Sequence, residues 1–287
     1  LNVNHYGNLK QHILTLITGQ RQYFEAKAAN TDHKSQAQTI VAVSLIETVM
    51  REKDLEAVSQ RTTDIMLQAG EGYTLKQWDW KAGPVVAAAE EEGGEAKKSG
   101  DIKFSSHHPV DVVRDIMRDS YDVQDWWIVR LYGNKWDYAA DYPHLAKQIL
   151  KAPGIVEMEA KFPRVVTSIT SETESDHIPA WLFIHKKTSS MPEGRMVLYV
   201  SKEAVLYDEP LMHREVPLYR MSAQDVIGVP IGYTTMFDLL APQQALNVAV
   251  STITSNLAAF GVQNVWVPEG AKLTVEQLKG GLKMITG

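Results

Sequence analysis

The chain contains no cysteine. This absence excludes disulfide frameworks, thiolate metal sites and cysteine nucleophiles, and it suits a reducing compartment. The sequence also lacks any run of about 18 apolar residues, so no transmembrane helix is expected, and no signal peptide is visible.

An overall basic character is absent as well. The net charge is −6, whereas proteins that grip nucleic acid tightly are typically basic, so any contact with DNA is expected to be local or loose. The length of 287 residues exceeds the usual ~100 to 200 of one domain and predicts two structural units. Because the chain starts at Leu1 and stops directly after a strand-like segment, we expect it to be part of a longer polypeptide.

Catalytic signatures are missing too. The chain has no H-E-x-x-H, G-x-S-x-G or G-x-x-x-x-G-K-[ST] motif, so a zinc protease, an α/β-hydrolase and a P-loop ATPase all lack their defining residues. His107 and His108 are adjacent on an expected strand and would point to opposite faces, away from a shared metal. We therefore expect no catalytic residue, no metal site and no cofactor.

One group of carboxylates needs separate treatment. Such a group is typical of a Mg²⁺ site in a nuclease, but Arg114 and Arg118 alternate with it, which favours an exposed, ion-paired turn. The carboxylates are those of Asp101, Asp111, Asp115 and Asp119.

Charge is also absent from one long stretch. Between Asp238 and Glu269 no side chain is charged. Apolar residues recur there at spacings of seven, four and three, which predicts a helix with Asp238 as its cap, Pro242 in its first turn and Gly261 at its end. We call the aligned apolar residues the apolar stripe: Leu239, Leu246, Val250, Ile253, Leu257 and Phe260.

Something must shield such a helix from water. The candidates are a bilayer, the core of a domain, and copies of the same helix in a ring or bundle. Amides and hydroxyls along the helix make the bilayer the weakest of the three. The residues expected to pack between subunits or to face a channel are Leu246, Asn247, Val250, Ser251, Ile253, Thr254, Leu257 and Phe260.

The remaining pattern predicts a mixed α+β fold. Helices are expected over residues 6–27, with a break at Gly19, and over 40–50, 55–67 and 138–150, with caps at Thr31 or Asp32 and at Gly70. Alternating residues predict strands at 73–80, 126–131, 165–170, 180–185, 195–200, 205–207 and 218–221, with a solvated loop over 87–100. After the uncharged helix come a strand at 262–267, a short helix at 274–278 and a final strand at 282–285.

The densest basic residues form a candidate contact cluster. They suit contact with nucleic acid, contact with carboxylates of a neighbouring molecule, or simply a solvated hairpin face. We call these residues the basic cluster: Lys186, Lys187, Arg195 and Lys202.

Several segments at the joints between these elements carry a family resemblance. They are TDHKSQAQ at 31–38, MREKDLEA at 50–57, QAGEGYTLKQWDW at 68–80, GYTTMFDLLAPQQALN at 232–247 and AAFGVQNVWVPEGA at 258–271. In their order along the chain they resemble the portal proteins, or head-to-tail connectors, of tailed double-stranded DNA bacteriophages. None of these segments is a catalytic signature, so their combined order carries the resemblance.

The resemblance implies an architecture. Residues 1–235 would form a mixed α/β wing, residues 236–260 a stem helix, and residues 261–287 the beginning of an α/β clip. The family also has a second stem helix and a returning wing segment, which nothing in this sequence supplies. That departure agrees with an incomplete chain.

The resemblance also implies a function: a homo-oligomeric, dodecameric ring at one vertex of the virion's capsid, assembled in the host cytoplasm, through which DNA is packaged and ejected. Its partners would be the major capsid protein, the terminase packaging motor, tail adaptor proteins and double-stranded DNA, held weakly and without sequence preference in the channel; no membrane is involved. The alternative is an enzyme that processes nucleic acid or carbohydrate and has no recognisable motif.

Overall fold

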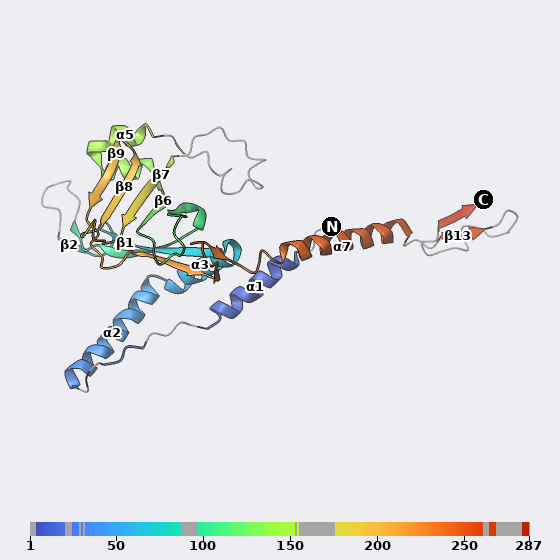
Figure 1. Cartoon of the computed structure of the whole chain (residues 1–287), viewed down its shortest axis with the longest axis horizontal. Coiled ribbons are helices and arrows are strands. Elements are labelled where there is room, and N and C mark those ends of the chain that lie inside the picture. The colour runs from blue at the N-terminus through green and yellow to red at the C-terminus, as the bar shows by residue number, and fades with distance from the viewer. Residues whose placement is uncertain are drawn as a thin grey trace. The chain divides into compact units, whose positions relative to one another are not determined.

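The computed structural model describes residues 4–20, 25–28, 30, 32–87, 97–152, 154, 176–260, 264–267 and 283–286. These residues form six α-helices together with antiparallel sheets of five, three and two strands, which confirms the expected α+β class (Figure 1). The chain divides into two compact units, one of Gln20–Thr234 and the other of Leu1–Gly19 with Thr235–Gly287.

The larger unit begins with two consecutive helices, α2 (His33–Glu52) and α3 (Leu55–Ala69). Asp32 occupies the N-cap position of α2, although its side chain makes no capping hydrogen bond, and Gly70 ends α3 in the left-handed conformation with φ of 88°; the positions of both predicted ends are confirmed. In Figure 1, α2 extends from the N-terminal end of α3 away from the two larger sheets of this unit.

A three-stranded sheet packs against α3. Its strand order is β10-β1-β4, from β1 (Glu71–Asp79), β4 (Asp101–His107) and β10 (Leu218–Ser222). Thr62 of α3 lies fully buried, and its hydroxyl is 3.0 Å from the hydroxyls of Thr74 and Ser106 on two of these strands. Gly72 is required beneath the helix, because a Cβ there would lie 2.6 Å from the carbonyl oxygen of Thr62.

A five-stranded antiparallel sheet forms the other half of this unit. Its strands follow chain order: β5 (Val112–Arg114), β6 (Trp126–Asn134), β7 (His177–His185), β8 (Arg195–Ser201) and β9 (Ala204–Glu209). Alternate residues of β7 are fully buried, as its two-residue period requires. Tyr73 and Leu75 of β1 join the same core, so one hydrophobic core links the two sheets.

The predicted helix at 138–150 is wrong in its continuity. The structure has α4 (Lys135–Asp141), a 3₁₀ turn η2 (Pro143–Leu145) and α5 (Ala146–Leu150). Pro143 has no backbone N–H and disfavours helical geometry at the residue before it, and Tyr142 accordingly adopts φ −128° and ψ 71°.

Three short elements complete the larger unit: the β2 (Val85–Ala87) and β3 (Lys97–Lys98) pair, the η1 turn (Pro109–Asp111), and the β11 (Gln224–Asp225) and β12 (Gly232–Tyr233) hairpin. His108 caps η1 and is not part of a strand as expected.

The smaller unit contains α1 (His5–Thr18), α7 (Leu240–Phe260), β13 (Asn264–Val267) and β14 (Lys283–Thr286). Helix α1 ends at the predicted Gly19 break, and the expected helical continuation is wrong for residues 25–27, which are not helical. The two strands pair in parallel. The predicted strand at 165–170, the helix at 274–278, Gly261 and most of the loop at 87–100 lie outside the described residues. The predicted divisions at 235 and 260 stay predictions.

Candidate assembly surface

Helix α7 occupies residues 240–260 of the uncharged segment. It begins at Leu240, two residues after the expected cap Asp238, and has Pro242 in its first turn. None of its described side chains is buried. Within the apolar stripe, Leu246 is 39% exposed, Ile253 58% and Leu257 66%. The described part of the chain therefore does not bury α7 in a domain core, which was one of the three environments expected for it.

Helix α1 contacts α7 within the smaller unit. The backbone N–H of Tyr6 donates to Oε1 of Gln243 at 3.0 Å, and Nε2 of Gln243 donates to Oδ1 of Asn247 at 3.0 Å. Asn247, Val250 and Ser251 are half-buried, whereas the described side chains from Thr252 onward are exposed. The apolar stripe is thus most exposed in the C-terminal half of α7.

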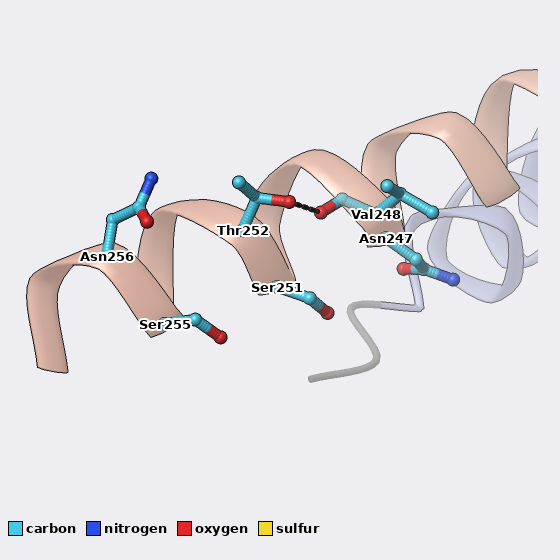
Figure 2. Close-up of a pocket in the computed structure, with 6 residues that line it drawn as sticks. All are labelled: Asn247, Val248, Ser251, Thr252, Ser255 and Asn256. Carbon is cyan, nitrogen blue, oxygen red and sulfur yellow. Dashed lines mark hydrogen bonds between the residues drawn. The ribbon is translucent and has the colours of Figure 1, made fainter. Parts of the chain in front are cut away.

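A second side of α7 is uncharged and carries small polar side chains together with Val248, which is 67% exposed. Two parallel rows of residues at four-residue intervals line an open, shallow hollow on this side (Figure 2): Asn247, Ser251 and Ser255 in one row, and Val248, Thr252 and Asn256 in the other. The Thr252 hydroxyl donates to the Val248 carbonyl at 2.9 Å, and Thr254 makes the equivalent bond to Val250. These two hydroxyls are satisfied within the helix, and none of the residues that line the hollow is charged.

The predicted packing and channel residues therefore divide between two sides of one helix. Leu246, Val250, Ile253 and Leu257 lie on the apolar stripe, and Asn247 and Ser251 line the polar hollow. Thr254 is exposed, and the side chain of Phe260 lies outside those described. An apolar side suits packing against another helix, whereas a neutral polar side suits water.

The basic cluster is only partly brought together. Lys186 and Arg195 lie at one end of the β7–β8 pair, with Lys187 in the adjoining turn. Lys202 follows the far end of β8, about 20 Å away at the rise of a β-strand. The structure therefore groups three of the four cations and separates Lys202 from them.

Two of the grouped cations are already ion-paired. Lys186 Nζ lies 2.9 Å from Asp125, and this bond lowers the pKa of the aspartate. Arg195 holds Asp208 with bonds of 2.8 and 2.5 Å and lowers the pKa of that carboxyl. Their charge is largely compensated within the chain, which favours the interpretation of a solvated hairpin face.

The four aspartates considered for Mg²⁺ do not converge. Asp101 pairs with Lys53, Asp111 lies 2.8 Å from Arg130, and Asp115 lies 3.6 Å from Arg118. Asp111 is buried, which corrects the expected exposed turn: a carboxylate beside a guanidinium tolerates burial. In the described ranges no three histidine, aspartate or glutamate side chains are grouped as metal ligands.

A buried ionic group was not predicted from the sequence. Glu71 Oε1 lies 2.6 Å from Arg114 Nη2, and Glu71 Oε2 lies 2.9 Å from Arg220 Nε. The same Oε2 accepts the backbone N–H of Gly232 at 3.0 Å, and Arg220 also reaches Asp225 at 2.7 Å. These residues come from β1, β5, β10, β11 and β12, so the group joins the two sheets and the β11–β12 hairpin.

Among the described helices, none combines the length and the apolar character that a bilayer crossing requires. Comparison with known proteins gave no match to any protein-family model and none to any curated protein.

Proposed function

We propose that this chain is part of a portal protein, a ring-forming conduit for double-stranded DNA at one vertex of a bacteriophage capsid. The observation that carries the proposal is α7: a helix of 21 residues with no charged side chain, in which Leu246, Ile253 and Leu257 of the apolar stripe are left exposed by the described part of the chain. The particular family is inferred from the segments at the joints between elements, which resemble those of portal proteins.

Packing between copies explains both sides of α7. Exposing a large aliphatic side chain instead of burying it forfeits about 1.5–3 kcal/mol, and neighbouring copies of α7 would recover this for Leu246, Ile253 and Leu257. Gln243, Gln244 and Asn256 interrupt the apolar sequence and disfavour lipid as the cover. A ring of such helices leaves the neutral polar side for a water-filled lumen.

The neutral side also suits DNA that must slide. Lys and Arg side chains hold phosphates, and a channel lined with them would retain the duplex. On α7 there are none. In this proposal the ring also gives the major capsid protein, the terminase motor and the tail adaptors a common platform.

Salt-dependent binding distinguishes the conduit from a DNA-processing enzyme. Each phosphate neutralised by Lys or Arg steepens the plot of log K against log salt by roughly 0.9. We expect the full-length ring to bind a free duplex at micromolar or weaker affinity, with a shallow slope and no sequence preference. A slope of about −5 or steeper, nanomolar sequence-selective binding, or Mg²⁺-dependent cleavage of the duplex would instead support the enzyme alternative.

A further inference from the structure

Two apolar surfaces of the larger unit involve residues other than the apolar stripe of α7. The first is the middle of α2, where no residue between Lys34 and Glu47 is charged. Every residue of α2 is described and none is buried; Ile40 is 68% exposed and Leu45 62%. Apolar residues at 40, 41, 45 and 46 point in several directions around the axis, so cover is needed on more than one side.

The second surface is the tip of the β11–β12 hairpin, residues 226–231, with the sequence VIGVPI. We call it the hairpin tip. It contains no charge, its Ile227 is fully exposed, and Val226, Val229 and Ile231 are each at least 40% exposed. Gly228 turns the chain with φ of 84°.

The hairpin tip stands on a fixed base. Asp225 and Gly232, at its two ends, are both tied into the buried ionic group through Arg220 and Glu71. The backbones of Gly70 and Gly232 approach so closely that a Cβ on Gly70 would lie 2.4 Å from the Gly232 oxygen. A tip held in this way loses little conformational entropy when it binds.

The two surfaces lie at opposite ends of α3. Helix α2 joins its N-terminus through the turn at Lys53 and Asp54, and the hairpin is held at its C-terminus, where the Thr234 hydroxyl donates to the Leu67 carbonyl at 3.0 Å. The 15 residues of α3 span about 22 Å. A projecting tip and a helix side differ in shape, so each can match the other on a neighbouring copy, either head to tail or reciprocally across a two-fold axis; the proposed closed ring requires the head-to-tail arrangement.

We propose that the hairpin tip of one copy docks against α2 of the next copy. The inference rests on the proposed ring and names a second contact within it. The four large aliphatic side chains of the hairpin tip can pack against those of the α2 residues that share one side of the helix, a small apolar centre of the kind found within interfaces. Neither surface carries a charge, so the contact desolvates none, and a partner recognised by complementary charge has nothing to pair with here.

Cysteine cross-linking tests this contact, because residues 1–287 contain no cysteine that would compete with an introduced pair. In the full-length protein, Ile227→Cys is combined in turn with Ile40→Cys, Val41→Cys, Leu45→Cys or Ile46→Cys and treated with a short bis-maleimide. At least one pair is expected to give a ladder of covalent oligomers, because every copy then carries both halves of the contact. The control pair joins Ile227→Cys with Glu203→Cys, on the exposed β8–β9 turn, and is expected to stay monomeric on a denaturing gel.

The outcomes separate this contact from the ring itself. If the mass corresponds to a closed oligomer but none of the four pairs gives a ladder, the contact would be overturned and the proposed function would stand. A dimer from Ile227→Cys alone would overturn it as well, since that result means tip-to-tip pairing. A protein that is monomeric by mass would overturn both.

A charge at the tip gives an independent readout. Ile227→Asp should weaken self-association at least about 10-fold, because burying an unpaired carboxylate at an interface is costly. Ser189→Asp, on an exposed turn, adds the same charge elsewhere and is the matched control. Equal association constants for the two variants would contradict the contact.

Discussion

Glu71 is the buried carboxylate at which two arginines and a backbone N–H of the larger unit converge. Its carboxylate is 2% exposed and is shared by two guanidinium groups and a backbone N–H. Arg114 and Arg220 are themselves largely buried. Charges can be buried at this depth only when they are paired and hydrogen-bonded.

Glu71→Ala leaves two buried cations without their carboxylate. We expect the free energy of unfolding to fall by about 3–5 kcal/mol, measured by urea denaturation. Asp208→Ala removes the carboxylate of the exposed Arg195 pair and is the matched control, with little change expected. Comparable losses from the two substitutions would show that burial does not govern the Glu71 group.

Tyr121 gives the larger unit an alkaline dependence. Burial raises the pKa of Tyr121 to about 12, against about 10 in an unfolded chain. Between these two values the unfolded chain loses a proton that the folded chain keeps, so the free energy of unfolding falls as pH rises, by at most about 1.4 kcal/mol per pH unit. Tyr121→Phe should flatten this fall, with the exposed Tyr219→Phe as control; an unchanged slope would contradict the assignment.

At the scale of single elements, the end of α3 depends on Gly70. An alanine there meets a left-handed φ, which costs about 1–2 kcal/mol, and its Cβ would also collide with the Gly232 oxygen. Gly228 has a similar φ but open space around it, so Gly228→Ala isolates the backbone cost. We expect thermal or urea unfolding to show a clearly larger loss of unfolding free energy for Gly70→Ala than for Gly228→Ala. Equal losses would mean that the β11–β12 hairpin shifts to accommodate the added Cβ.

Helix α7 allows assembly to be separated from folding. Leu257 is 66% exposed in the single chain, so Leu257→Asp should leave the unfolding transition of the larger unit in place while preventing ring formation, measured by sedimentation. Leu257→Met conserves volume and should assemble normally. An assembled, heat-stable ring carrying Leu257→Asp would show that the apolar stripe is not a subunit contact.

Local chemistry explains which elements were predictable from the sequence. Gly70 marks a helix end because it readily adopts the left-handed conformation, Asp32 belongs to a residue type common at the N-cap position that it occupies, and β7 shows the two-residue period of a half-buried strand. The break at Pro143 was missed because the apolar spacing continues across it. Proline chemistry overrides that spacing.

The candidate surfaces were predictable only in part. Absence of charge identified α7, and the same signal at 35–46 and 226–231 would have identified α2 and the hairpin tip. Apolar spacing does not distinguish a helix covered by its own chain from one covered by a neighbour, so the exposure of α2 required the structure. The Glu71 group was not predictable, since Glu71 and Arg220 lie 149 positions apart and meet only through the pairing of β1 and β10.

For the whole molecule, the central claim is that these uncharged apolar surfaces are covered by other copies in a closed ring. The most direct test is the mass of the full-length protein at micromolar concentration over a range of salt, with micrographs of the same sample. We predict one closed cyclic species of fixed subunit number, twelve if the portal resemblance holds, visible as rings. A monomer in every salt, with no rings in the micrographs, would contradict the account.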